Sequence, residues 1–173
     1  MLRVDLGELR VGPVEIDGQL AADDSALAGA VPGLIILAPV QAKGRLSTAG
    51  EGRFYWRAKL STAVRADCRR CLAPVDVPVE ASLAIVFGYE GESVEGDGCY
   101  LIPARAKALD LTQAVREELI LVLPHFVECR PDCRGLCPRC GADLNDGPCG
   151  CAPAEDPRWD ALRALNQPER KGD

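Results

Sequence analysis

Histidine is almost absent from this 173-residue sequence, in which His125 is the only one. It has no serine, aspartate or cysteine partner at a spacing typical of nucleophilic catalysis. Glu117 and Glu118 are adjacent on a predicted helix, and neighbours in a helix do not face one cavity. We therefore expect a protein that is not an enzyme and has no small-molecule substrate.

Long apolar runs are missing as well. The longest, Leu34 to Ala38 with its neighbours, is too short to span a bilayer. The first ten residues, MLRVDLGELR, lack the apolar core of a signal peptide. These absences predict no membrane contact and a location in the cytoplasm, where thiols stay reduced.

The sequence also lacks an excess of basic residues. Aspartate and glutamate number 26 and lysine and arginine 20, so the formal net charge is −6. This balance gives no overall attraction to nucleic acid, and any RNA contact must be local. The hydrophobic fraction of 47% is nevertheless enough for a packed core in one domain with an appendage.

Cysteine is what the sequence has in abundance, and six of its nine cysteines lie between Cys129 and Cys151. No apolar face at a period of 2 or 3.6 runs through this segment, so a buried core cannot hold it in shape. An odd number of cysteines in a reducing compartment favours metal ligation over disulfides. The stretch Cys137-Pro-Arg-Cys140-Gly141 has the spacing of a zinc knuckle, in which the glycine lets backbone N–H groups face the sulfurs.

The clearest periodicity covers residues 54–66 and 75–87, where apolar and polar side chains alternate. Two amphipathic strands joined by a short loop predict an antiparallel hairpin, and Pro78 suggests that part of the second strand lies at a sheet edge. The loop carries a second C-x-x-C pair, Cys68 and Cys71. A thioredoxin-like redox motif requires a strand-to-helix junction, so metal binding is the preferred interpretation.

Weaker signals predict the other strands. Val4 and Leu6, and the residues from Val14 to Leu20, suggest short strands, and a further strand signal from Leu34 ends in a break at Gly44. Residues 21–33 suggest a loop or a short helix. Residues 88–100 form an acidic, glycine-rich loop in which Cys99 stands alone, and Leu101 and Ile102 add a short strand.

Two helices are predicted in the C-terminal third. Asp110, with Gln113 three residues on, forms a capping-box pattern before a helix from Leu111 to Leu123 that should dock on the sheet. Asp156 and Pro157 open a short final helix. The expected class is α+β: an antiparallel sheet with one covering helix over residues 1–124, and a cysteine-rich zinc-binding appendage with that final helix over residues 125–173.

Apart from Cys99, the cysteines form four pairs that combine into two four-thiolate sites in three ways. Because closing a short loop costs less entropy, the pair 137/140 should join 149/151, which leaves 129/133 to join 68/71 at the hairpin tip. Gly135 would turn the chain between the two sites. The expected cofactor is two zinc ions, held by Cys68, Cys71, Cys129 and Cys133 (site 1) and by Cys137, Cys140, Cys149 and Cys151 (site 2). The alternative is a two-zinc cluster within the tail, with Cys68 and Cys71 unused or redox-active.

Six arginines lie in or beside these motifs: Arg65, Arg69, Arg70, Arg130, Arg134 and Arg139. They are candidates for binding RNA phosphates. They could equally offset the negative charge of a divalent ion bound by four thiolates, and both interpretations stay open. Tyr55, on the polar face of the first long strand, could stack on a base.

Several blocks of the sequence resemble the bacterial YceD family of large ribosomal RNA subunit accumulation proteins. They are Cys68-Arg-Arg-Cys71-Leu72, the helix 110–124, the run from Cys133 to Asn145, Cys149-Gly-Cys151 and Asp156-Pro-Arg158. The resemblance spans roughly residues 34 to 165. It implies metal binding, nucleic-acid binding and a role in 23S ribosomal RNA accumulation or processing and in large-subunit assembly.

The resulting hypothesis is a zinc-binding ribosome-biogenesis factor that binds ribosomal RNA or a large-subunit precursor particle. Some relatives keep the motif of Cys68 and Cys71 but lack the later cysteines, so the resemblance makes site 2 a stabilising addition. Two alternatives remain. One is a zinc-ribbon adaptor that binds a ribosomal protein or a processing enzyme without touching RNA. The other is a thiol redox or zinc-responsive switch at Cys68 and Cys71.

Overall fold

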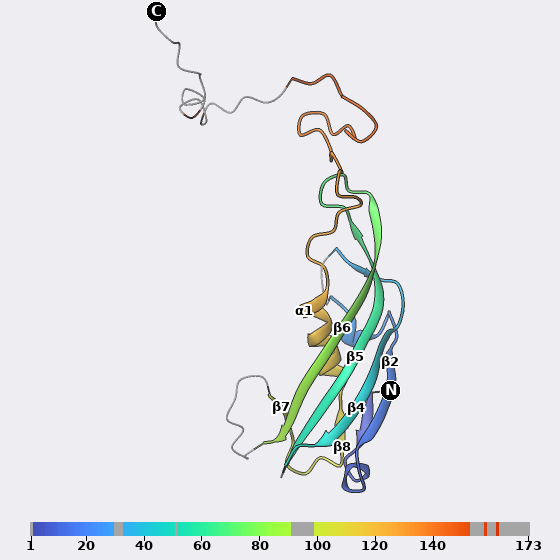
Figure 1. Ribbon diagram of the computed structural model, residues 1–173, viewed down its shortest axis with the longest axis vertical. Coiled ribbons are helices and arrows are strands. Elements are labelled where there is room, and N and C mark those ends of the chain that lie inside the picture. The colour runs from blue at the N-terminus through green and yellow to red at the C-terminus, as the bar shows by residue number, and fades with distance from the viewer. Residues whose placement is uncertain are drawn as a thin grey trace, which may run out of the picture.

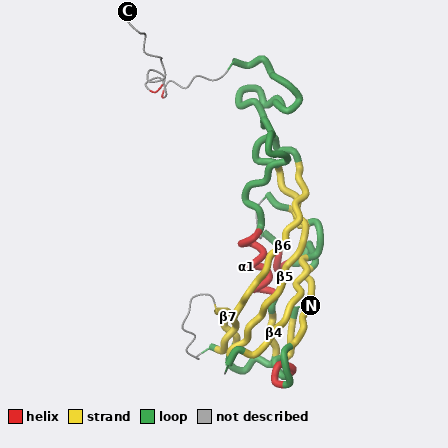
Figure 2. Tube along the Cα trace, in the orientation of Figure 1, coloured by secondary structure: helices red, strands yellow, loops and turns green. Residues whose placement is uncertain are grey.

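The computed structural model describes residues 2–29, 33–50, 52–90 and 99–152, together with Arg158 and Leu162. Within these residues the chain forms an elongated, strongly twisted sheet with one α-helix against it (Figures 1 and 2). The strands are β1 (Arg3–Asp5), β2 (Val14–Leu20), β3 (Ile35–Ile36), β4 (Val40–Thr48), β5 (Arg53–Asp67), β6 (Pro74–Tyr89), β7 (Cys99–Ile102) and β8 (Ala108–Asp110). The helix α1 is Thr112–Val122, and two 3-10 turns are η1 (Glu8–Arg10) and η2 (Ser25–Leu27).

The main sheet has the strand order β2-β4-β5-β6-β7, with β3 pairing with the far end of β5, while β1 and β8 pair separately. The long hairpin β5–β6 is its backbone, in antiparallel register from Arg53 opposite Gly88 to Asp67 opposite Pro74. The alternation predicted from the sequence is confirmed, since Trp56, Leu60 and Val64 are buried on the inner face. The α+β class is thereby confirmed.

Helix α1 covers the inner face of the sheet and closes the core. Leu111, Val115 and Leu119 are fully buried against it, in one cluster with Trp56 and Phe87. The Asp110 side chain accepts a hydrogen bond of 2.9 Å from the N–H of Thr112, but the N-cap residue of the helix is Leu111, which makes no side-chain capping bond. The capping box predicted with Gln113 is not observed, and the Gln113 amide donates to Glu117 at 2.9 Å. The described helices include none long and apolar enough to cross a bilayer.

Three local expectations are corrected by the structure. Gly44 does not break its strand, since β4 runs through it to Thr48. The loop predicted over residues 88–100 is shorter at both ends, because β6 extends to Tyr89 and Cys99 begins β7. Strand β7, which includes the predicted Leu101 and Ile102, pairs parallel to β6, so the sheet is mixed and not wholly antiparallel.

The chain after α1 runs along the molecule to the hairpin tip and continues beyond it, which places the cysteine-rich segment at one end (Figure 1). The division into units at residue 124 stays a prediction. The helix expected from Asp156 lies outside the described residues. The tip of the hairpin and the segment that reaches it are the parts that position the cysteines.

The correction at Gly44 generates a prediction. A β-carbon at this position would lie 2.1 Å from the carbonyl oxygen of Arg57 and 2.4 Å from the Cα of Ala58, so β4 and β5 would have to separate. Gly44→Ala should therefore lower the free energy of unfolding by about 3 kcal/mol. Gly12→Ala is the control, because nothing lies within 4 Å of a β-carbon there. Urea unfolding of both variants checks this; equal stabilities would contradict the close approach of the strands.

Candidate metal centres

Site 1 lies where the hairpin tip meets the segment after α1. The sulfurs of Cys68, Cys71, Cys129 and Cys133 all lie within 4.8 Å of one another. Cys71 Sγ is 3.6 Å from Cys129 Sγ, and Cys68 Sγ is 3.9 Å from Cys133 Sγ. The structure thus brings the tail pair to the tip pair, 65 residues away for Cys68 and Cys133.

Site 2 lies within the tail itself. The sulfurs of Cys137, Cys140, Cys149 and Cys151 also lie within 4.8 Å of one another. The four-thiol sets are the two that loop closure favours, and the cluster of six tail cysteines is not formed. None of the nine cysteines, all of which the structure describes, forms a disulfide.

The two C-x-x-C turns have the same backbone geometry. In site 1 the N–H of Leu72 donates to the Cys68 carbonyl at 2.9 Å, and the N–H of Cys68 donates to the Ala73 carbonyl at 2.8 Å. In site 2 the N–H of Gly141 donates to the Cys137 carbonyl at 2.9 Å, and Cys137 to Ala142 at 2.8 Å. Each turn closes an antiparallel pair, Asp67 with Pro74 and Leu136 with Asp143. The chain therefore contains one knuckle structure twice.

The knuckles differ at the residue after the second cysteine. Gly141 has a φ of 74°, which glycine adopts without strain, whereas Leu72 has a φ of 61°. Leu72 is the only described residue other than glycine with a positive φ, and its side chain is 62% exposed. Packing therefore does not explain a leucine in this conformation.

Backbone N–H groups create the electrostatics expected of such turns. The N–H groups of Cys71, Cys129 and Arg70 point at the Cys68 sulfur and lower the pKa of its thiol to about 6. The N–H groups of Cys140 and Arg139, with the Cys149 thiol, lower the pKa of Cys137 to about 6 in the same way. The backbone of each knuckle thus favours the thiolate form of its first cysteine.

The remaining thiols show the opposite effect. Withdrawal of its sulfur from water, together with the neighbouring thiols, raises the pKa of Cys129 to about 12. Hydrogen bonding to Cys140 and Cys149 raises the pKa of Cys151 to about 12. Four sulfurs this close cannot all ionise without a cation among them.

The donor set fits zinc. A zinc ion bound tetrahedrally by four thiolates at about 2.3 Å holds its sulfurs about 3.8 Å apart, close to the two separations in site 1. The sites differ in exposure. Cys68, Cys71 and Cys133 are buried and pack with Ala73, Val75 and Leu136, whereas in site 2 only Cys137 is buried. Both groups could hold a metal ion, and site 1 is the better shielded.

Further contacts join the hairpin tip to the tail around site 1. The N–H of Arg69 donates to the Val127 carbonyl at 2.9 Å, and the N–H of Leu136 donates to the Arg70 carbonyl at 2.9 Å. Gly135 has a φ of 73° and lies so close to the tip that a β-carbon would be 2.8 Å from that same Arg70 carbonyl. This is the turn that the sequence predicted at Gly135.

Asn145 connects the two sites. It lies in the loop between Cys140 and Cys149, yet its amide nitrogen is 3.5 Å from the Cys133 sulfur of site 1. Its amide oxygen accepts hydrogen bonds from the Arg134 backbone N–H at 2.9 Å and from Arg130 at 2.8 Å. Sequence analysis missed this role. The position of Asn145 within the turn Asn-Asp-Gly gave only a turn signal.

Four of the six candidate arginines make contacts inside the protein. Arg65 forms a two-point ion pair with Asp76 in the hairpin at 2.6 and 2.8 Å. Arg69 and Arg70 both pair with Glu128, and Arg70 also donates to the Cys133 carbonyl at 2.9 Å.

The fourth is Arg130, which lies in the tail and donates to Asn145, with Asp132 3.5 Å away. The side chains of Arg134 and Arg139 are exposed and form no ion pair within the described residues.

Two sequence candidates lie apart from both sites. His125 is exposed and belongs to neither thiol group. Cys99 begins β7, where burial raises the pKa of its thiol, and it too belongs to neither group. Phe126, which the sequence did not single out, is 76% exposed beside the tip, with the Arg69 guanidinium 5.5 Å from its ring centre.

The fold and these sites define a class: an α+β protein whose long hairpin and C-terminal tail carry two four-cysteine groups able to hold metal ions. The family model for the large ribosomal RNA subunit accumulation protein YceD matches residues 56–166, most of the chain, including every one of these cysteines. The chain belongs to the YceD family.

Individual relatives agree with this assignment. An uncharacterized protein of Mycobacterium tuberculosis is 36% identical over 107 residues, which is 60% of this chain and 51% of that protein. A chloroplastic YCED homolog 1 of Zea mays, also named as a large ribosomal RNA subunit accumulation protein, is 34% identical over 74 residues, 42% of this chain and 25% of that one. The chain thus spans about half of the first relative and a quarter of the second. No solved structure matches it.

Substitution of one cysteine in each site should separate their roles. Cys68→Ser and Cys149→Ser should each lose one metal ion, because each site needs four thiolates. Only Cys68→Ser should release the tail from the hairpin and speed tryptic cleavage after Arg134, by at least about tenfold. Native mass spectrometry and limited proteolysis measure the two effects. Equal protection of Arg134 in Cys68→Ser and the parent would contradict the link through site 1.

Leu72 provides a test of the knuckle geometry. Because its φ of 61° suits glycine and opposes a β-branched side chain, Leu72→Gly should keep or raise thermal stability. Leu72→Ile should lower stability by about 1–2 kcal/mol, although it keeps the apolar volume. Thermal unfolding of the zinc-loaded proteins compares the three. If Leu72→Gly is the least stable of the three proteins, the leucine side chain contributes packing at this position and the explanation from backbone conformation is wrong.

Proposed function

We propose that this protein is a non-enzymatic, zinc-binding factor that promotes 23S ribosomal RNA accumulation or processing and large-subunit assembly by binding ribosomal RNA or a precursor particle. The observation that carries the proposal is the pair of four-thiol groups in a chain of the YceD family. The names of the plant relatives, large ribosomal RNA subunit accumulation proteins, support the ribosomal part.

Zinc is the metal that the donor set favours. Four thiolates in a tetrahedral arrangement select zinc over the hard cations magnesium and calcium. Zinc does not change oxidation state, so the ions hold the tail in shape and neutralise the sulfurs. The lowered pKa of Cys68 and of Cys137 favours the thiolate form that metal binding requires.

The absence of enzymatic activity is part of the proposal. A catalytic zinc needs an open coordination position for water or substrate, and four thiolates at each site leave none. We also place the protein in the cytoplasm, since nine unpaired thiols suit a reducing compartment.

At the cysteine end, Arg134 and Arg139 are the arginines proposed to bind RNA. Both side chains are exposed, and both flank the thiol groups. Arg69 and Arg70 are poor probes of RNA binding despite their position at the tip. Reversing their charge would break the contacts to Glu128 and to the Cys133 carbonyl, and would release the tail along with any RNA.

An adaptor that binds a ribosomal protein or a processing enzyme is the second candidate. Two exposed apolar side chains beside the tip favour it, Leu72 and Phe126, at 62% and 76% exposure. Such an adaptor would co-sediment with precursor particles and show no affinity for naked RNA.

The double variant Arg134→Glu/Arg139→Glu should weaken binding of a 23S ribosomal RNA fragment at least about tenfold and reduce the slope of log affinity against log salt by about 1.4–1.8. Filter binding at several salt concentrations measures both quantities. The matched control is Arg105→Glu/Lys107→Glu, which makes the same charge change between β7 and β8.

Metal content of each variant should equal that of the parent, since none of these side chains belongs to a thiol group. If both double variants weaken binding equally, the attraction is a general charge effect. If the parent binds no RNA but co-sediments with precursor particles, the protein is an adaptor and the proposal of RNA binding is wrong.

A further inference from the structure

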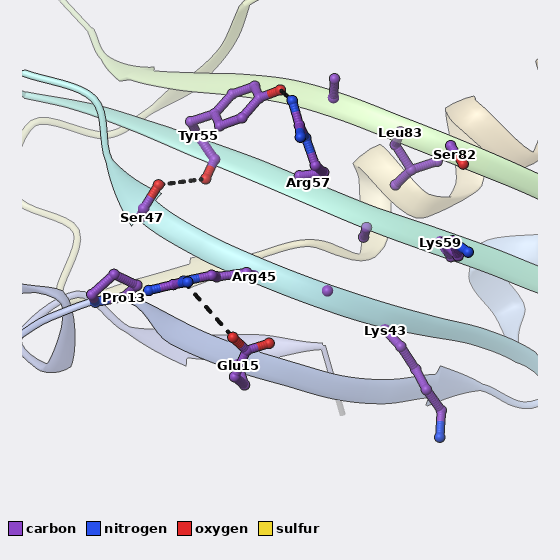
Figure 3. A pocket seen from close by; sticks show the side chains of 13 residues that line it. Pro13, Glu15, Lys43, Arg45, Ser47, Tyr55, Arg57, Lys59, Ser82 and Leu83 are labelled. Carbon is purple, nitrogen blue, oxygen red and sulfur yellow. Dashed lines mark hydrogen bonds and ion pairs between the residues drawn. The ribbon is translucent and has the colours of Figure 1, made fainter.

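The outer face of the sheet carries a block of four cations that the cysteine motifs do not include. Lys43 and Arg45 lie on β4, and Arg57 and Lys59 lie on β5. All four side chains are exposed, on the face opposite the buried row of β5 (Figure 3). With Tyr55 and parts of β2 and β6 they line an open groove of about 1020 Å³.

The register makes this block unfavourable in the free protein. Lys43 lies directly opposite Lys59, and Arg45 directly opposite Arg57. Like charges opposite each other on neighbouring strands destabilise the pair. In a chain with more acidic than basic residues, two such rows side by side concentrate positive charge on one face of the sheet.

Carboxylates neutralise only one side of the block. Lys43 pairs with Asp17 at 3.0 Å and Arg45 with Glu15 at 3.8 Å, both on the outer strand β2. Within the described residues neither Arg57 nor Lys59 forms an ion pair. The residues opposite them on β6 are the small Ala84 and Ser82, which leave space beside these two cations.

An aromatic ring lies at the end of the block. Tyr55 is half-buried, and the Arg57 guanidinium lies 5.8 Å from its ring centre, with an Nη 3.4 Å from its hydroxyl. Figure 3 shows the two side chains meeting above β5. Exposed aromatic rings next to arginine on an open sheet are a common platform for stacking unpaired bases.

We propose that this groove binds a single-stranded segment of RNA, with Arg57, Lys59, Lys43 and Arg45 on the phosphates and Tyr55 stacked on a base. Successive rows of side chains on one strand face lie about 6.7 Å apart, comparable to the separation of phosphates in an extended strand. A duplex is excluded as the preferred ligand, because its bases are not free to stack on a side chain.

This inference rests on the proposed function, since it adds a second RNA contact to the one at the cysteine end. Along β5, Arg57 lies about 30 Å from the hairpin tip at the usual strand rise. The two surfaces are therefore separate and can be tested separately.

The probe is a single-stranded oligouridylate of about ten nucleotides, a length suited to one sheet platform. Arg57→Glu/Lys59→Glu should weaken its binding at least about tenfold and reduce the salt slope by about 1.4. Because the new carboxylates would face Arg45 and Lys43, stability should not fall, and metal content should not change. Arg105→Glu/Lys107→Glu is again the charge-matched control.

The tyrosine supplies a second, uncharged test. Tyr55→Leu should weaken binding about tenfold by removing the ring, whereas Tyr55→Phe keeps the ring and should bind within about twofold of the parent. Duplex RNA of the same length should bind more weakly than the single strand.

The outcomes separate the two proposals. A parent that binds no RNA overturns both. A parent that binds while the Arg57/Lys59 variant binds equally well overturns the sheet contact alone. Loss in that variant, with no effect of Arg134→Glu/Arg139→Glu, supports the sheet contact and removes the cysteine end from the RNA interface. If polyglutamate competes as well as RNA and Tyr55→Leu has no effect, the groove is a site for acidic protein and the inference is wrong.

Discussion

The structure depends on four sulfurs, two from a hairpin tip and two from a tail with no apolar core, meeting in one place. The site favours ionisation of these thiols unequally: backbone N–H groups lower the pKa of Cys68 to about 6, while withdrawal from water and the neighbouring thiols raise the pKa of Cys129 to about 12. A divalent cation among them offsets this difference, since it favours every thiolate at once. The tail can then keep one shape at the end of the β5–β6 hairpin. Metal–thiolate attraction and backbone hydrogen bonds hold it there, whereas most protein segments are held by burial of apolar side chains.

Much of this end of the molecule could be predicted from the sequence. The spacing of the cysteines defined the pairs, and loop closure chose between the possible partitions, because thiol ligation needs few residues and short connections. The conformation of Leu72 could not be predicted, since no sequence rule assigns a left-handed conformation to an exposed leucine. The role of Asn145 was also hidden. It requires site 2 to fold back against site 1, and only the assembled tail shows that.

The sheet shows where sequence reasoning fails for a different reason. Gly44 was interpreted as a break, whereas it allows β4 and β5 to approach more closely than a β-carbon permits. The parallel pairing of β7 and the rows of Lys43 with Lys59 and Arg45 with Arg57 arise from register between strands. Alternation within one strand gives its two faces, but not which residues of another strand lie opposite. Most of the arginines that stood out by their proximity to cysteines bind groups of the protein itself, whereas the less conspicuous Arg57 and Lys59 of β5 form no ion pair within the described residues.

The continuous pairing of β5 with β6 fixes the distance between the cation block on the sheet and the cysteine sites at the hairpin tip. Fifteen paired positions make a stiff connection, so the cation block and the cysteine end keep their separation whatever either one binds. Two weak contacts on a stiff spacer bind a single large ligand far more tightly than either alone, provided that the ligand presents both sites at that distance. A protein with a net charge of −6 can in this way bind a polyanion through local patches and still be repelled by RNA that offers only one of the two contacts. Under the proposed function, selectivity would come from the length of the hairpin as much as from the residues at its ends.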